Sequence, residues 1–297
     1  MAEHELVSDA FDGALLEALA HFELNLRTLT SSGVRGERRS RRRGGGTEYA
    51  DHRQYAHGDD LRRLDWHALA RLDQMLIRLY AADEALPLEV VMDASASMDF
   101  GAPTKFVTGA RVGACLTQMA LSHNTPARWR IALGKTHEPL SLKGRGELPK
   151  LLRALDETVP DGKGAMEHAL RDSVLQGPRK RALIAITDGY DAQPLQHALR
   201  AVRGGGAEVG LVLVLAPEET NPQERGEYTL IDSESEAASR MTIDGAAIKR
   251  YRRMLASFRE GWTDFCRTHG LMFVEISSDT PIDAALFRTL ASSGMIG

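Results

Sequence analysis

The most constraining feature of this sequence is a regular alternation of short apolar runs with longer amphipathic segments from residue 87 onward. The apolar runs predict buried strands at residues 88–92, 182–187, 209–215 and 271–276. Apolar side chains at helical spacing predict helices at residues 105–122, 166–175, 194–202 and 246–269. Strands that alternate with helices favour a mostly parallel sheet with both faces covered. We therefore expect a doubly wound α/β fold with helices on both sides of the sheet.

Weaker patterns fill the gaps between these elements. Residues 128–133 alternate like a strand, and residues 139–142 are expected to be its hairpin partner. Residues 147–157 and 281–290 look helical, and residues 228–244 interrupt the alternation in a way that suggests an inserted hairpin.

The first 80 residues differ from this regular part. Residues 6–29 place apolar side chains at helical spacing, which predicts an amphipathic helix. Residues 35–46 are basic and glycine-rich, which is typical of a loop. A segment dense in charged and aromatic residues follows, and residues 75–80 read as a strand. We divide the chain into a mixed region over residues 1–80 and an α/β domain over residues 81–297.

The composition excludes some classes of protein. Of the 297 residues, 43% are hydrophobic and 26% charged, which is ordinary for a globular protein in water. The net charge of −4 argues against a nucleic-acid partner, despite the basic loop. No signal peptide and no run long enough to span a bilayer is evident, so we expect a cytoplasmic protein without membrane insertion. Cys115 and Cys266 form no metal-binding motif and are expected to be buried thiols.

Oxygen-bearing side chains follow two of the predicted strands. Asp93 ends the first strand and is followed by Ser95 and Ser97, and Asp188 follows the strand at residues 182–187. In an open α/β sheet, ligands bind outside the carboxyl ends of the strands. Two carboxylates and two hydroxyls make a hard oxygen set that suits Mg²⁺ or Mn²⁺. The alternative is structural, since the same side chains can cap the next helix and satisfy turn amides.

The loop from Asp93 to Ser97 resembles the DxSxS loop of the metal-ion-dependent adhesion site in von Willebrand factor A-like domains, and Asp188-Gly189 resembles the later aspartate loop of that fold. The resemblance implies a metal site formed by Asp93, Ser95, Ser97 and Asp188. It also implies a threonine from a middle loop, where this sequence has Gly164. The cation is therefore conditional: glycine offers no side-chain oxygen, the nearby Lys163 would repel a cation, and Asp161 is a candidate substitute.

The segment before the first strand carries a second resemblance. Its unusual residues are Arg53, Tyr55, Gly58, Asp59, Asp60, Arg62, Asp65, Trp66 and Arg71. This pattern is similar to the signature of the bacterial domain of unknown function number 58 family, which precedes a von Willebrand factor A-like domain. The resemblance implies a partner, a MoxR-type AAA+ ATPase, and a role in maturing other proteins whose identity the sequence does not give.

The signature itself has two interpretations. Opposite charges this close in sequence favour a structural ion-pair network with Trp66 as an apolar anchor. The functional interpretation is a docking surface for the partner.

These observations lead to one functional hypothesis and two alternatives. We expect a non-catalytic, chaperone-like adaptor that binds protein partners and is not an enzyme. The first alternative is a metal-dependent hydrolase, for which no general base is evident in the sequence. The second is a metal-free structural scaffold.

Overall fold

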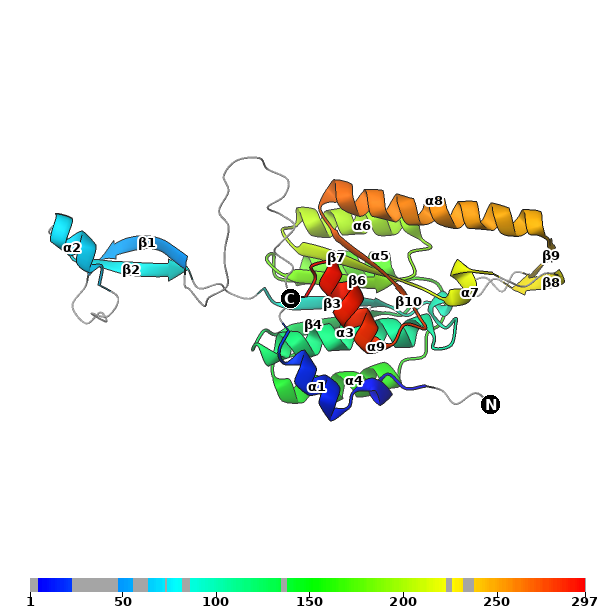
Figure 1. The fold of residues 1–297 in the computed structure, drawn as a ribbon, viewed down its shortest axis with the longest axis horizontal. Coiled ribbons are helices and arrows are strands. Elements are labelled where there is room, and N and C mark those ends of the chain that lie inside the picture. The colour runs from blue at the N-terminus through cyan, green and yellow to red at the C-terminus, as the bar shows by residue number, and fades with distance from the viewer. Residues whose placement is uncertain are drawn as a thin grey trace. The chain divides into compact units, whose positions relative to one another are not determined.

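A six-stranded sheet forms the centre of the larger part of the protein in a computed structural model (Figure 1). Its strands are β3 (Leu88–Asp93), β4 (Ala127–Ala132), β5 (Leu140–Leu142), β6 (Ala182–Thr187), β7 (Glu208–Leu215) and β10 (Met272–Ser277). They lie in the order β10-β7-β6-β3-β4-β5. All neighbouring strands are parallel except β5, which pairs antiparallel with β4. The predicted mostly parallel α/β fold and the hairpin partner at residues 139–142 are confirmed.

The structure describes residues 5–22, 48–55, 64–72, 74–81, 86–134, 138–222, 226–231 and 238–296. The chain falls into two compact units. One comprises residues 1–34 and 86–297, and the other comprises residues 35–85.

Helices cover both faces of the sheet (Figure 1). One face packs against α3 (Lys105–Ser122), α4 (Leu148–Asp156) and the C-terminal turns α9 (Ile282–Ala284) and η6 (Ala285–Leu290). The other face packs against α5 (Met166–Gln176), α6 (Ala192–Gly204) and α8 (Gly245–His269). Because both faces are covered, every residue of β3 and β6 is buried, which explains why both strands are apolar apart from Glu89, Asp93 and Thr187.

The N-terminal segment corrects two expectations. The helix predicted from residue 6 begins at Gly13, because Asp12 is extended and its carboxylate accepts the amide of Leu15; the short turn η1 (Ser8–Ala10) precedes it. The helix is α1 (Gly13–Leu19), and the predicted residues beyond Phe22 lie outside the described part. Val7 and Leu19 are buried in the core beside α3. Residues 1–34 therefore group with the α/β domain, and not with the signature region as the division at residue 80 assumed.

The smaller unit contains an antiparallel pair of strands and one helix. These are β1 (Glu48–Gln54), β2 (Leu76–Ala81) and α2 (Trp66–Leu72). The strand expected at residues 75–80 is thus present, shifted by one residue. The amide of Tyr55 donates to the carbonyl of Met75, and the amide of Asp65 donates to that of Leu76, so two signature residues are hydrogen-bonded to the start of β2 and the residue before it.

The remaining elements are short. They are η4 (Ala96–Met98), η5 (Arg145–Glu147), α7 (Pro217–Thr220) and the hairpin of β8 (Gly226–Ile231) with β9 (Ala238–Ile243). The hairpin confirms the predicted insertion. Cys115 and Cys266 are free and buried, as expected. None of the helices described here has the length and apolar character needed to cross a membrane.

Candidate functional site

The order of the strands creates a switch point between β3 and β6. From β3 the chain continues to β4 on one side, and it later returns to β6 on the other side. Crevices at such points are the usual ligand sites of open α/β sheets. Asp93 is the last residue of β3, and Asp188 directly follows β6, so both carboxylates lie at this crevice.

All four predicted metal-site residues are brought together there. The Ser97 hydroxyl donates to Oδ2 of Asp188 (2.7 Å), and the Ser95 and Ser97 hydroxyl oxygens are 3.1 Å apart. Asp93 accepts from the amide of Ser95 (3.0 Å) and from the hydroxyl of Thr187 (2.6 Å). The loop from Asp93 to Ser97 and the end of β6 therefore form one connected polar cluster.

The structural alternative accounts for only part of this arrangement. Asp93 does satisfy a turn amide. However, Ser95 makes no side-chain cap on η4, and α3 is capped by Thr104, whose hydroxyl accepts the amide of Val107 (3.2 Å). The two serine hydroxyls instead face each other and Asp188.

Asp93 is in an unfavourable electrostatic position. Burial, followed by the negative charge of Asp188, raises its pKa to about 6, although hydrogen bonds from Thr187 and Ser95 oppose the shift. The cluster therefore favours either a proton or a cation beside these two carboxylates.

The middle loop lies against this cluster as the resemblance implied. The amide of Asp161 donates to the carbonyl of Ala94, and the amide of Ala96 donates to that of Gly162. A Cβ placed on Gly164 would be 4.0 Å from Cβ of Ser95, with no closer neighbour. Position 164 thus faces Ser95 and has room for a larger side chain.

A small cavity opens between the two loops, with a volume of about 30 Å³. It is lined by Asp93, Ser95, Gly164, Met166, Glu167, Thr187, Asp188, Tyr190, Asp191 and Leu195. Ser97 does not line the cavity, and its hydroxyl joins the cluster through the hydrogen bond to Asp188. Asp161, the candidate substitute, is not among the lining residues either: it is exposed, and its carboxylate accepts the amide of Gly162. Lys163 is also exposed and does not line the cavity.

The donor set fits a single hard cation. The cavity is large enough for one water-sized species, and its polar wall consists of carboxylate and hydroxyl oxygens. Within the described residues there is no cluster of three or more His, Cys, Asp or Glu side chains able to hold a metal, so a cation here would depend on the serine hydroxyls.

Sequence reasoning missed a fully buried lysine in the same cluster. Nζ of Lys105 lies 2.9 Å from Oδ2 of Asp188 and 2.7 Å from Oε1 of Glu219, which follows β7 in α7. Lys105 is the first residue of α3, where a cation opposes the helix dipole. The sequence signal for this contact is a lysine at the start of a predicted helix, because a cation at that end is unfavourable unless an acidic side chain compensates it.

Glycine residues bring α3 close enough to the sheet for this contact. A Cβ on Gly109 would lie 2.9 Å from Ile186, and one on Gly113 would lie 2.7 Å from Trp129. Lys105 lies one further turn along the same stripe of α3. The close approach of the helix places the ammonium group beside Asp188.

Aromatic side chains surround the cluster at the surface. Phe100 and Tyr190 are 46% and 49% exposed, and their ring centroids lie 5.9 Å and 5.0 Å from the Lys105 ammonium. Tyr190 also contacts Phe258 of α8. Partial burial and the charge of Glu219 raise the pKa of the Tyr190 hydroxyl, which stays neutral. Half-exposed aromatic rings beside buried charges are typical of protein-binding surfaces.

The signature residues lie in the smaller unit. Asp65 caps α2, since its carboxylate accepts the amides of His67 and Ala68. Trp66 is 61% exposed, so its predicted role as a buried anchor is wrong. Arg71 is exposed in the last turn of α2, Tyr55 is half-buried, and only the backbone of Arg53 is described. Gly58, Asp59, Asp60 and Arg62 lie outside the described residues, and the ion-pair network stays a prediction.

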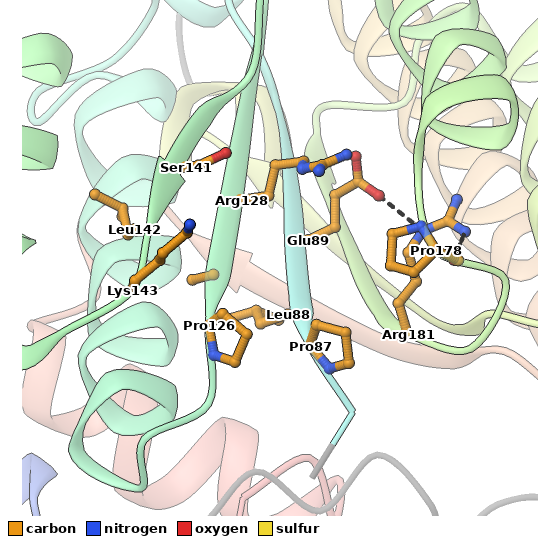
Figure 2. Close-up of a pocket in the computed structure, with 11 residues that line it drawn as sticks. Pro87, Leu88, Glu89, Pro126, Arg128, Ser141, Leu142, Lys143, Pro178 and Arg181 are labelled. Atoms are coloured by element: carbon orange, nitrogen blue, oxygen red, sulfur yellow. Dashed lines mark hydrogen bonds and ion pairs between the residues drawn. The ribbon is translucent and has the colours of Figure 1, made fainter. Parts of the chain in front are cut away.

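A larger pocket of about 150 Å³ lies at the amino ends of β3 and β4, away from the cluster (Figure 2). Beside it, the buried carboxylate of Glu89 pairs with Arg130 (2.9 Å) and Arg181 (2.7 Å) and accepts the Ser173 hydroxyl (2.8 Å). Figure 2 shows Glu89 reaching toward Arg181, with Pro87 at the start of the strand. Both carboxylate oxygens are satisfied within the protein, which indicates a structural role.

Comparisons with known proteins give a family and distant likenesses. The family model described as "Protein of unknown function DUF58" matches residues 51–260. Uncharacterized proteins of Mycobacterium bovis and Mycobacterium tuberculosis are 28% identical over 306 residues, which covers 97% of this chain and 92% of theirs.

Three solved structures are also similar. The conserved hypothetical protein BatB from Bacteroides thetaiotaomicron has a TM-score of 0.43 at 14% identity, covering 70% of this chain and 98% of that one. An aerotolerance-related membrane protein from Bacteroides fragilis has a TM-score of 0.40 at 15% identity, covering 67% and 94%. Proximal thread matrix protein 1 from the mussel byssus has a TM-score of 0.35 at 14% identity, covering 44% and 38%.

Proposed function

Because this chain belongs to the DUF58 family, whose function is unknown, we propose a function from the site itself: a non-catalytic adaptor that binds an acidic group of a protein partner at the carboxyl edge of its sheet. The observation that carries the proposal is the polar cluster at the switch point, where Asp93, Ser95, Ser97 and Asp188 converge. The half-exposed rings of Phe100 and Tyr190 lie near the ammonium group of Lys105, which contacts Asp188.

The oxygen set supports a divalent cation as part of this site. Ser95, Ser97, Asp93 and Asp188 would hold Mg²⁺ or Mn²⁺, and the bound ion would supply positive charge for a carboxylate of the partner. The chain itself supplies the remaining contacts: the rings of Phe100 and Tyr190 offer apolar area at the edge, and the small cavity limits the site to one ion.

The proposed partner is the MoxR-type AAA+ ATPase that the sequence resemblance implies. In this proposal the adaptor joins the ATPase to a client protein during assembly or maturation of that client, in the cytoplasm. In this proposal, α2 with its exposed Trp66, which belongs to the signature that defines the family resemblance, offers a second contact surface.

Two binding measurements test the proposal. Calorimetric titration with MgCl₂ and MnCl₂ should show one site, and pull-down of a purified MoxR-type ATPase should weaken with chelator and with Asp93→Ala. Asp99→Ala is the matched control, because Asp99 lies in the same loop but is exposed. Partner binding that survives both chelator and Asp93→Ala would exclude the metal-bridged adaptor and favour the metal-free scaffold. Phosphoester turnover that Ser97→Ala abolishes would favour the hydrolase.

The vacant ligand position allows a gain-of-affinity test. Gly164→Thr adds a hydroxyl beside Ser95, where a side chain has room. We expect the Mn²⁺ dissociation constant to fall by roughly tenfold, since one further oxygen ligand joins the set. An unchanged constant would mean that position 164 does not face the cation.

A further inference from the structure

Lys105 holds the position where a cation would neutralise Asp188. Its side chain is 1% exposed, and its ammonium group lies 2.9 Å from Oδ2 of Asp188. The same oxygen accepts the Ser97 hydroxyl at 2.7 Å. The lysine therefore contacts an oxygen that a metal bound to the Ser97 side of the cluster would also use.

The lysine is shared between two acidic groups. Its second partner, Oε1 of Glu219, lies at 2.7 Å. Glu219 is itself fixed, because its Oε2 accepts the amide of Ala216 (2.8 Å) and its backbone carbonyl accepts the Tyr251 hydroxyl of α8 (2.8 Å). Buried charges need a partner of opposite sign, and the ammonium group of this lysine has two such partners, Asp188 and Glu219.

We propose that Lys105 is a tethered cation that competes with the divalent ion for Asp188, and that Glu219 sets the strength of this competition by holding the ammonium group on its other side. The inference rests on the proposed metal-assisted adaptor function and deepens it, because it assigns the residues that set the affinity of that site. An ammonium group close to Asp188 repels a divalent ion, and a stronger attraction toward Glu219 reduces that repulsion.

The two residues are expected to act in opposite directions. Lys105→Met removes the competing charge and leaves Asp188 in need of a cation, so the Mn²⁺ dissociation constant should fall at least tenfold. Glu219→Gln leaves Asp188 as the one anionic partner of Lys105 among its described contacts, so the constant should rise at least threefold.

Calorimetric titration of the full chain with MnCl₂ and with MgCl₂ measures both effects, and the shift of the melting temperature on adding metal checks them independently. Lys150→Met and Glu218→Gln are the matched controls, because each makes the same charge change at an exposed position, on α4 and α7 respectively. Both controls should leave the dissociation constant within twofold of the wild type.

The outcomes separate this inference from the function it rests on. Metal binding that is equal in the wild type, Lys105→Met and Glu219→Gln overturns the competition and leaves the metal site intact. A complete lack of binding in all variants, Gly164→Thr included, overturns both. If Lys105→Met does not fold, Glu219→Gln alone decides, and a constant that is unchanged or lower in that variant contradicts the proposal.

Discussion

The raised pKa of the buried Asp93 carboxyl group makes the stability of the protein depend on pH and on a bound cation. The pKa of this group is raised from 3.8 to about 6, mainly by burial and next by the charge of Asp188. A raised carboxyl pKa means that folding disfavours the charged form, so the ionised Asp93 lowers the free energy of unfolding above pH 6. This loss disappears as the pH falls toward 4, because the carboxyl group becomes protonated in the folded protein. The full penalty is on the order of 3 kcal/mol in the free energy of unfolding.

We therefore predict that the metal-free wild type gains stability relative to Asp93→Asn between about pH 7 and about pH 4. Urea denaturation in chelator at several pH values measures the difference between the two proteins. Saturating Mg²⁺ should remove most of this pH dependence, because a cation stabilises the charged carboxylate. A difference that stays constant with pH would show that Asp93 titrates normally.

At the level of single residues, the sequence identified the four oxygen-bearing side chains because they follow strands at fixed spacing. It did not identify Lys105, because its two partners lie 83 and 114 residues away along the chain. It also misjudged Trp66, since an aromatic residue among charges looks the same whether it is buried or exposed. The loop can be predicted from the local spacing of its residues, whereas the burial of a side chain depends on contacts between segments that are distant in the sequence.

At the level of elements, the close packing of α3 on the sheet determines where the site lies. Gly109 and Gly113 allow the helix to approach β3 and β6, and a Cβ on Gly109 would lie 2.9 Å from Ile186 and 3.0 Å from Met92. Overpacking of this kind shifts backbone and side chains.

Gly109→Ala is accordingly predicted to lower the free energy of unfolding by about 1–3 kcal/mol. It should also strengthen Mn²⁺ binding, because a shift of α3 away from the sheet moves the competing ammonium group of Lys105 away from Asp188. Thermal and chemical denaturation measure the first effect, and titration measures the second. Gly261→Ala is the matched control: Gly261 lies in α8 with no atom near its Cβ position, and this change should stabilise the protein by about 1 kcal/mol. Equal effects of the two substitutions would contradict the close-packing argument.

The elements themselves were largely predictable. The expected helix at residues 105–122 and the expected strand at residues 182–187 coincide with α3 and β6, because both are long, apolar and bounded by clear signals. The N-terminal helix was predicted to begin too early, since the apolar spacing continues through residues 6–12 although Asp12 caps a new helix at Gly13. Capping by a side chain overrode the periodicity at that point.

At the scale of the whole molecule, the sequence predicted two regions but placed residues 1–34 in the wrong one. The segment is held by contacts that no local pattern reveals: Arg111 pairs with Glu5 (2.7 Å), and the amide of Ser8 donates to Asp156 (3.2 Å). The smaller unit, residues 35–85, thus enters the α/β unit as an insertion between its first segment and β3. An insertion with its own strands and helix can supply a second binding surface.

Trp66 is the residue that tests this role of the smaller unit. It is 61% exposed in α2, so Trp66→Ala should change the free energy of unfolding by no more than about 0.5 kcal/mol. Exposed tryptophans are frequent centres of binding energy, and we expect affinity for the MoxR-type ATPase to fall at least tenfold. Leu175→Ala, at an 82% exposed position on α5, should affect neither property. A melting temperature several degrees lower in Trp66→Ala would assign the residue a structural role, and unchanged affinity with an unchanged melt would remove the smaller unit from the interface.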